Sequence, residues 1–426
     1  MNNRRTLLGS SSSTIKSHNL RAILLTLLRR ESISRVHLAQ LTGLSTTTIT
    51  NLISELLAEG IVIEIGAEKR EPSQGAGRPR TGLQLVPEAR YAIGVHIGIG
   101  AVYVTVTDLR AHPVIELSLD FEVGQPPEKV LPRMVDLVQE AIETSGVNPA
   151  HIVGIGVGAS GLVDPYEGVN VIAPTLGWRD VPIRDWLSQR LGLPVTVDNN
   201  VRAMALGEAM FGPEQDVYVL AFVYARIGLA AGFVVGGQLY RGAGAGAGEI
   251  GHTTIIPNGG EHCRCGNTGC LETLFSEPVI VRLAHEIATK NPRGKLAQHL
   301  RRAETLDTVF DAARNGDEST LDMLRERARY MGIALANLVN TLNPELIVFG
   351  GIFEQGADLL LPTVEATMRE RAFADLGERV RLKTTSFSKR PGIIGAAALA
   401  LNAFFYQNSD VLPRKTVAHR SDEVWN

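Results

Sequence analysis

Near residue 90 the sequence changes character, and few folds are compatible with such a change. Before this point, apolar residues recur three and four positions apart, which is the spacing of amphipathic helices. From Tyr91 onward, short runs of β-branched residues punctuated by glycine alternate with helical stretches. That alternation is typical of α/β domains. The chain is therefore predicted to join a mainly helical front module to a larger α/β body.

The distribution of charge changes at the same place. The 426 residues carry a net charge of −3, but residues 1–90 contain 12 Lys and Arg against 7 Asp and Glu, which leaves −8 for the rest. A basic front on an acidic body suggests a module that binds a polyanion. The long uncharged stretches, 91–107 and 391–409, are interrupted by glycine or polar residues. We therefore expect no membrane span and a cytoplasmic protein.

The front module carries the signals of three helices. The first is predicted over 19–30 from its stripe of leucines and isoleucine. Ser34 can cap a second helix over 35–41 that stops at Gly43, and a third, capped by its own first serine, is predicted over Ser45–Glu59. Two helices joined by a short turn containing glycine form a helix-turn-helix, a common DNA-reading motif.

The two faces of the third helix differ in a way that favours DNA binding. One face is apolar, whereas the other carries short, uncharged hydrogen-bonding groups. A helix that is merely solvated usually carries Lys and Glu there, and short groups suit close docking into a major groove. We expect contacts to base edges and phosphates from Ser45, Thr46, Thr47, Thr50 and Asn51.

A wing is predicted after the third helix. Residues 61–65 and 83–86 alternate as strands, and the Gly/Pro-rich loop between them contains Arg78 and Arg80. Pro79 favours an extended backbone at Arg78, so the loop could place two arginines in a minor groove. A helical protein-interaction domain and a flexible basic linker are the alternative interpretations.

The body has the pattern of two similar lobes. A predicted meander of three strands over 91–121 is followed by a helix and further strands up to residue 198. A second glycine-flanked hairpin begins at 217 and repeats the pattern, with helices within 274–342 and a strand at 346–349. A cleft between two lobes is the natural place for a small ligand.

One string of residues makes the family resemblance specific. Glu249-Ile-Gly-His252 is followed by Cys263-Arg-Cys265-Gly-Asn-Thr-Gly-Cys270-Leu-Glu272, after a helix-turn-helix and a Gly-Arg-Pro wing. In this order the chain resembles the ROK family over about residues 15–405. That family groups sugar kinases with sugar-responsive transcriptional repressors. The resemblance implies an actin/hexokinase-like α/β body with two lobes, and a C-terminal helix that returns to the first lobe.

These patterns predict five segments. They are a disordered lead-in (1–14), a winged helix-turn-helix domain (15–87), a first lobe (88–200, with the helix 391–405 returning to it), a second lobe containing a metal site (201–390) and a tail (406–426).

The three cysteines of the chain cannot form a disulfide framework, and their spacing favours a metal. One imidazole and three thiolates suit tetrahedral zinc, and four protein ligands leave no open position, so one structural ion is expected. The alternative is a set of buried or reactive thiols. The resemblance assigns the imidazole to His252 and not to the nearby His262. The predicted ligands are His252, Cys263, Cys265 and Cys270.

The resemblance also shows where this sequence departs from a kinase. The family's first phosphate loop begins with an Asp where this chain has His96, and its second loop has glycine and threonine where this chain has Arg226 and Ile227. The position of the catalytic base is occupied by Asn200, an amide with no useful basicity. The chain is therefore not expected to be an enzyme. The alternative is a sugar kinase with an appended DNA-binding domain.

The sugar pocket is better preserved than the phosphate loops. The resemblance places effector contacts at Gly158, Thr175, Asn199, Asn200, Glu249, His252 and Glu272. Arg202 and Arg226 could receive an acidic or phosphorylated sugar, or could simply pair with carboxylates.

Together these features predict a sugar-responsive DNA-binding transcriptional regulator of the repressor type, whose partners are operator DNA and a sugar effector. Helix-turn-helix proteins usually bind DNA as dimers, so a homodimer or homotetramer is expected. A zinc-stabilised adaptor that binds another protein is a third interpretation.

Overall fold

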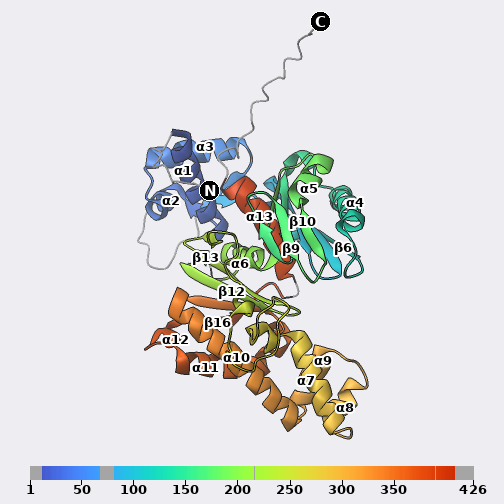
Figure 1. Ribbon diagram of the computed structural model, residues 1–426. Coiled ribbons are helices and arrows are strands. Elements are labelled where there is room, and N and C mark those ends of the chain that lie inside the picture. Colours follow the sequence, from blue (N-terminus) through green and yellow to red (C-terminus); the bar gives the residue numbers. More distant parts are fainter. Residues whose placement is uncertain (1–11, 68–80, 215, 389, 408–426) are drawn as a thin grey trace.

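The computed structural model describes residues 12–67, 81–214, 216–388 and 390–407. Figure 1 shows a helical front domain beside the first of two α/β lobes, with the second lobe at the opposite end of the molecule. None of the described helices is both long and apolar enough to cross a membrane.

The front domain consists of three helices and a small sheet. Ser34 caps the second helix, which ends at Gly43 in a left-handed conformation (φ 69°), and Ser45 caps the third. The strands lie in the order β1-β3-β2, so β2 and β3 form the expected wing hairpin. The elements are α1 (Ser12–Arg29), β1 (Ile33–Ser34), α2 (Arg35–Thr42), α3 (Thr46–Ala58), β2 (Val62–Ala67) and β3 (Thr81–Leu85).

The lead-in predicted over 1–14 is too long, because α1 begins at Ser12. The apolar stripe alone marks the helix only from residue 19. Once the buried part of a helix is formed, however, each extra turn adds hydrogen bonds at little cost, so the helix continues past its apolar face. Residues 1–11 lie outside the described part of the chain.

The two lobes are built on sheets with the same strand order. In each sheet a three-stranded antiparallel meander is extended by two parallel strands on the far side of its first strand. The first sheet has the order β11-β7-β4-β5-β6: Val195–Asn199, Ile152–Ala159, Tyr91–Ile97, Ala101–Thr107 and Pro113–Asp120. The second has the order β14-β13-β12-β15-β16: Gln238–Tyr240, Leu229–Val235, Val219–Ala225, Leu346–Gly351 and Arg381–Thr384.

Each lobe carries its own additional elements. The first lobe has a small antiparallel sheet near its cleft side and two helices: β8 (Leu162–Asp164), β9 (Val169–Ala173), β10 (Trp178–Val181), α4 (Pro127–Ser145) and α5 (Ile183–Leu191). The second lobe is mainly helical outside its sheet: α7 (Glu277–Lys290), α8 (Lys295–Leu300), α9 (Leu306–Arg314), α10 (Glu318–Leu342), α11 (Phe353–Arg371) and α12 (Leu376–Arg379).

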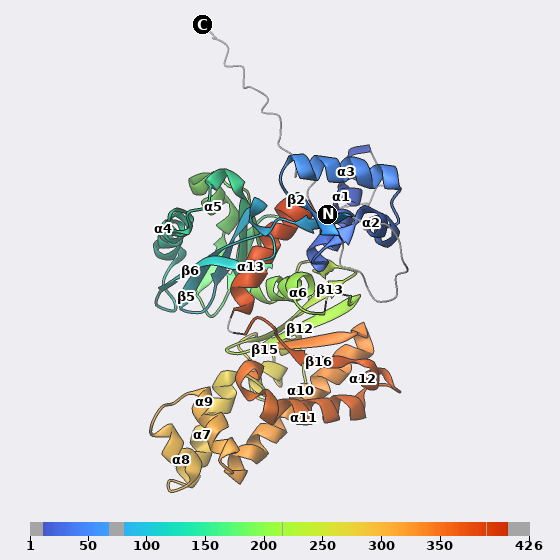
Figure 2. The same ribbon diagram turned by 180° about the vertical axis from the view of Figure 1, so that it is seen from behind.

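Two helices cross between the lobes. The helix that follows the first sheet, α6 (Asn200–Phe211), packs on β12 and β13 of the second sheet, and α13 (Pro391–Leu401) returns to pack on β4 and β7 of the first. Glycine makes the close approach possible, since a Cβ on Gly156 of β7 would lie 2.0 Å from the Ala396 carbonyl oxygen. Figure 2 shows α6 and α13 side by side at the centre of the molecule.

The front domain is packed on the body and not merely tethered to it. Buried residues of α1, including Leu20 and Leu24, belong to one apolar cluster with residues of α6, α13 and the π-helical turn Asn402–Tyr406. Tyr406 is fully buried and its hydroxyl donates a 2.6 Å hydrogen bond to the Leu109 carbonyl. The tail predicted from residue 406 therefore starts one residue too early, because this aromatic ring closes the core.

Candidate functional site

The polar face of α3 is exposed, as a DNA-reading helix requires. Thr46, Thr47, Thr50 and Asn51 are all exposed, whereas the opposite side of the helix is buried through Ile49, Leu52, Ile53 and Leu56. The Ser45 hydroxyl accepts a 3.1 Å hydrogen bond from the Thr48 amide, so this residue caps the helix. Arg78 and Arg80 of the predicted minor-groove arm lie outside the described residues.

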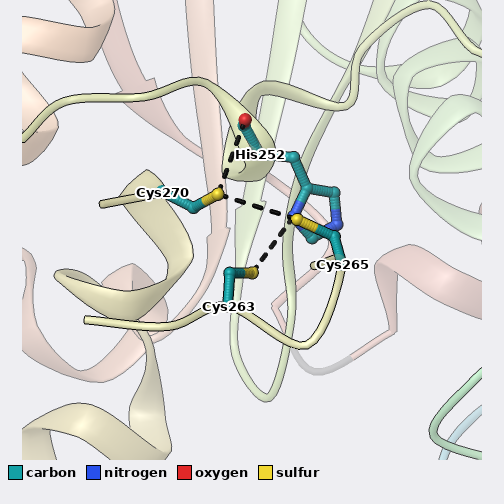
Figure 3. A group of neighbouring side chains, drawn as sticks. All are labelled: His252, Cys263, Cys265 and Cys270. Carbon is teal, nitrogen blue, oxygen red and sulfur yellow. Dashed lines mark hydrogen bonds between the residues drawn. The ribbon is translucent and has the colours of Figure 1, made fainter. Parts of the chain in front are cut away.

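The four predicted metal ligands converge at one point of the second lobe (Figure 3). Their donor atoms all lie within 4.8 Å of one another. His252 Nδ1 lies 3.6 Å from Cys263 Sγ, and the sulfurs of Cys265 and Cys270 are 3.7 Å apart. A zinc tetrahedron with bonds of ~2.3 Å to sulfur and ~2.0 Å to nitrogen has edges of ~3.8 Å and ~3.5 Å. These two separations match the edges, and the others are at most 4.8 Å, so the group could hold a metal ion.

The backbone of this loop is shaped for the cluster. Gly269 has a φ of 69°, and a Cβ there would lie 1.8 Å from the Ile256 carbonyl oxygen, so only glycine fits between the strands of the loop. Burial raises the pKa of the Cys270 thiol to about 12, so without a nearby cation that thiol would stay protonated. His262 pairs with Thr268 in an isolated β-bridge and does not belong to the cluster.

A pocket of about 490 Å³ lies between the lobes, next to the metal cluster. The size is within the range of small-molecule sites. His252 and Cys265 belong both to the cluster and to the pocket wall, so the metal loop forms part of that wall. Of the predicted effector contacts, Thr175, Asn199, Asn200, Glu249, His252 and Glu272 line the pocket.

Two of the predicted contacts, Gly158 and Asn199, serve the fold of the first lobe. Gly158 does not line the pocket, because it lies within β7, where a Cβ would meet the start of α6 at 3.4 Å. The loop after it, Ser160 and Gly161, forms the wall instead. Asn199 caps α6: its Oδ1 accepts from the amide of Val201 at 2.9 Å, and its Nδ2 donates to the Gly161 carbonyl at 2.8 Å.

Glu249 is the carboxylate that is left open to the pocket. No described residue makes a hydrogen bond or ion pair with its side chain. Burial raises its pKa, against the smaller opposing effects of His252 and Arg202. A half-buried carboxylate without a partner is costly, and hydroxyl donors from a ligand would remove that cost. This side chain is therefore a ready acceptor for a polyhydroxylated ligand.

Glu272 is held by residues that the sequence alone did not indicate. Its Oε2 accepts from the Leu229 amide at 2.9 Å, and its Oε1 accepts from Arg264 Nε at 3.1 Å. Arg264 is the residue between the first two cysteines of the cluster. It lies in a turn that is closed by a 2.9 Å hydrogen bond from the Gly266 amide to the Cys263 carbonyl, so its place between two cysteines carried no signal of this contact.

Arg202 is a structural residue. Its guanidinium is almost completely buried (1% exposed) and donates to Asp198 Oδ1 at 2.6 Å, while Arg241 donates to Asp198 Oδ2 at 2.7 Å. Of the two roles left open for Arg202 by its sequence, pairing with a carboxylate is the one observed. Asp198, engaged on both oxygens, has no free oxygen with which to act as a base.

The four residues that depart from the kinase pattern, His96, Arg226, Ile227 and Asn200, all line the pocket. Burial, with a smaller contribution from the charge of Arg226, lowers the pKa of His96 to about 4, so this ring is neutral near pH 7. Arg226 lies 3.4 Å from Glu277 and is 62% exposed. Asn200 Nδ2 donates to the Ser160 hydroxyl at 3.2 Å. An imidazole without charge, a paired guanidinium and an amide offer no carboxylate base at these positions.

Comparisons with known proteins agree with this architecture. The sequence matches the ROK family over residues 92–403 and a winged helix-turn-helix DNA-binding domain over residues 16–63. A putative xylose repressor from Caldicellulosiruptor sp. (strain Rt8B.4) is 34% identical, with 91% of this chain and 96% of that protein covered. A glucokinase from Halalkalibacterium halodurans is 31% identical, with 73% of this chain and 94% of that enzyme covered.

The structural comparison includes the front domain. A crystal structure of a ROK family transcriptional regulator, a homologue of the Escherichia coli Mlc protein, superposes with a TM-score of 0.80 at 27% identity, covering 93% of this chain and 98% of the other. The predicted winged helix-turn-helix followed by a two-lobed, hexokinase-like α/β body is thereby confirmed. The family match spans most of the chain and agrees with the motif string, so the protein belongs to the ROK family.

Proposed function

We propose that this protein is a sugar-responsive transcriptional repressor that acts in the cytoplasm on operator DNA. The observation that carries the proposal is the combination, in one packed unit, of an exposed polar face on α3 and a pocket in which an amide, Asn200, stands at the position of the family's catalytic base. The similarity to a putative xylose repressor over 91% of the chain supports it. The α3 residues Thr46, Thr47, Thr50 and Asn51 would read base edges, with Ser45 at the helix start close to phosphate.

The pocket would bind the effector through Asn200, Glu249, His252, Glu272 and Thr175. A zinc ion on His252 Nδ1 would leave the proton on Nε2, which would make this ring a hydrogen-bond donor to a sugar hydroxyl while Glu249 acts as an acceptor. The ion itself would supply structural stabilisation of the loop, since the cluster provides four protein ligands. Sites built from such paired donors and acceptors discriminate strongly between patterns of hydroxyl groups.

The contacts of α1 support a route from the pocket to the DNA. Arg110 of the first lobe donates to the Leu28 carbonyl at the end of α1 at 3.0 Å. On the other side, Arg29 of α1 pairs with Asp216 at 3.5 Å, and Arg21 donates to the Gly237 carbonyl in the second lobe at 3.5 Å. Because α1 touches both lobes, a change in their closure would move the front domain. In a homodimer or homotetramer this would alter the spacing of the two reading helices.

Sugar phosphorylation is the rival function, and the glucokinase relative favours testing it. We expect no turnover of ATP with D-glucose, D-xylose or N-acetyl-D-glucosamine in a coupled assay, because Asn200 replaces the base. Sugar-dependent ATP hydrolysis that is abolished by Asn200→Ala would contradict the proposal.

The repressor function can be tested with the full-length, metal-loaded protein. DNA sites are selected from a random duplex library, and binding is then measured by fluorescence anisotropy with and without each sugar. Asn51→Ala and Thr47→Ala should each weaken binding by about 1–3 kcal/mol for every base-specific interaction that the shortened side chain can no longer make. Thr289→Ala, an exposed threonine of α7, is the matched control and should leave binding unchanged. Unchanged binding in both α3 variants, or no selected DNA at all, would contradict the proposal.

A further inference from the structure

Arg264 occupies an unusual place in the molecule. It stands between Cys263 and Cys265, two members of the metal cluster, and its side chain reaches into the pocket. An ion bound by both neighbouring residues would hold the backbone on either side of Arg264 and so fix where its side chain begins. Its guanidinium would then be positioned as accurately as a residue on a strand, although it lies in a loop.

The guanidinium joins the two lobes across the pocket. Nη1 donates a 2.8 Å hydrogen bond to the Thr175 hydroxyl, which lies between β9 and β10 of the first lobe. Nε and Nη2 lie 3.1 Å and 3.0 Å from Oε1 of Glu272 in the second lobe. One planar side chain thus fixes a residue from each wall of the pocket.

These contacts leave hydrogen-bonding capacity for a ligand. A guanidinium has five N–H donors, and the three contacts leave one free donor on Nη1 and one on Nη2. Thr175 accepts from Arg264 and keeps its own hydroxyl proton. The side chain of Arg264 is 43% exposed and lines the pocket, so a ligand hydroxyl can reach it.

We propose that Arg264 is a specificity-determining residue that donates to a hydroxyl of the bound effector while Thr175 holds it across the cleft. This proposal rests on the proposed sugar-binding function. The ligand class it names is a polyol with neighbouring hydroxyls, one accepting from Arg264 and another donating to an acceptor such as Glu249. A ligand without the first hydroxyl leaves a cationic donor unsatisfied and binds more weakly.

The test measures dissociation constants by calorimetry for the full-length, metal-loaded protein. The probe is whichever of D-xylose and D-glucose binds the wild type, together with its monodeoxy analogues. Arg264→Gln should weaken the parent sugar at least tenfold. In the wild type one deoxy analogue should bind at least tenfold more weakly than the parent sugar, and in Arg264→Gln that difference should disappear. A purely structural role would weaken all the analogues equally.

Two further variants keep the result interpretable. Thr175→Val removes the hydroxyl at nearly constant shape, and combining it with Arg264→Gln should add less than its own single effect, because the two residues act through one contact. Arg282→Gln is the control, since Arg282 pairs with Glu261 in the same lobe without lining the pocket. Metal content is measured for every variant, and if Arg264→Gln fails to retain the ion, Thr175→Val alone provides the test.

The outcomes are distinct. If the wild type binds sugar and Arg264→Gln binds the parent and each analogue as tightly as the wild type does, the role of Arg264 is overturned and the proposed function stands. If the wild type binds neither sugar, the effector assignment fails, and the role of Arg264 fails with it.

Discussion

The two lobes share a strand order but are completed by different means. One face of the first sheet is covered by α13, which packs closely on Gly94 and Gly156. The apolar cluster around this helix continues into the front domain. The second lobe has an apolar core of its own, but the segment 252–272 that faces the cleft contains few apolar residues and is folded around the His/Cys cluster. The two walls of the cleft therefore differ in what holds them. The first lobe is held by packing, whereas the segment 252–272 of the second lobe depends on polar contacts and on the His/Cys cluster.

The largest expected effect comes from removing the metal. Stripping the ion with a chelator should expose the backbone of 252–272 to hydrogen exchange, because structural zinc contributes ~10–16 kcal/mol in isolated zinc-finger peptides. The helix α4 of the first lobe should keep its protection. Exchange is measured by mass spectrometry on both segments, with His262→Ala as a control that retains the ion. Equal loss of protection in the two segments would mean that the lobes do not differ in this way.

Breaking the buried ion pair comes next. Arg202→Met should destabilise the protein by about 3–5 kcal/mol, because Asp198 would lose a partner while remaining buried. Arg325→Met removes an exposed pair with Asp322 and should cost at most about 1 kcal/mol. Both are measured as changes in the free energy of unfolding in urea. A similar small effect in both variants would show that Arg241 alone satisfies Asp198.

The contact between β7 and α13 leaves no room for an added methyl group at Gly156. Gly156→Ala is expected to destabilise the protein by about 1–3 kcal/mol, since the new Cβ would overlap the backbone of α13. Gly244→Ala has no heavy atom within 4 Å of its added Cβ and should be neutral or slightly stabilising. Thermal unfolding of both variants compares them. Equal midpoints would show that α13 is free to shift on the first sheet.

Much of this arrangement follows from local patterns in the sequence. The caps at Ser34 and Ser45, the exposed face of α3 and the grouping of the three cysteines depend on spacing within a single segment, which a sequence reports directly. The choice of His252 as the fourth member comes from the family motif. The family could be predicted for the same reason, because it rests on motifs that follow one another along the chain. The comparisons confirm it.

The remaining features depend on contacts between distant segments. Arg264 meets Thr175 across 89 positions, and Arg241 meets Asp198 across 43, so neither contact is written in its local sequence. Gly158 is predicted to line the pocket together with the rest of the loop 158–161. In the structure it still belongs to β7, and only the later residues of the loop reach the pocket. Packing across the cleft decides which residues of a motif face the ligand.

The smallest predicted effect is a pH dependence that originates in the first lobe. Burial holds the pKa of His96 at about 4 in the folded protein, compared with 6.5 for an exposed histidine. Because the folded-state pKa is the lower one, the unfolded chain takes up the proton first as the pH falls below 6.5. Stability should therefore decrease between pH 7 and pH 5.5 by about 1 kcal/mol from this residue alone.

The comparison with a variant isolates this contribution. His96→Asn removes the titrating ring, so the wild type should lose more stability than the variant over the same pH range. Parallel stability curves for the two proteins would mean that His96 takes up a proton in the folded state, for instance because the cleft opens enough to hydrate it. In that case the first lobe would be more open at the cleft than its apolar packing implies, and the contrast between a first lobe held by packing and a second-lobe segment held by the His/Cys cluster would have to be abandoned.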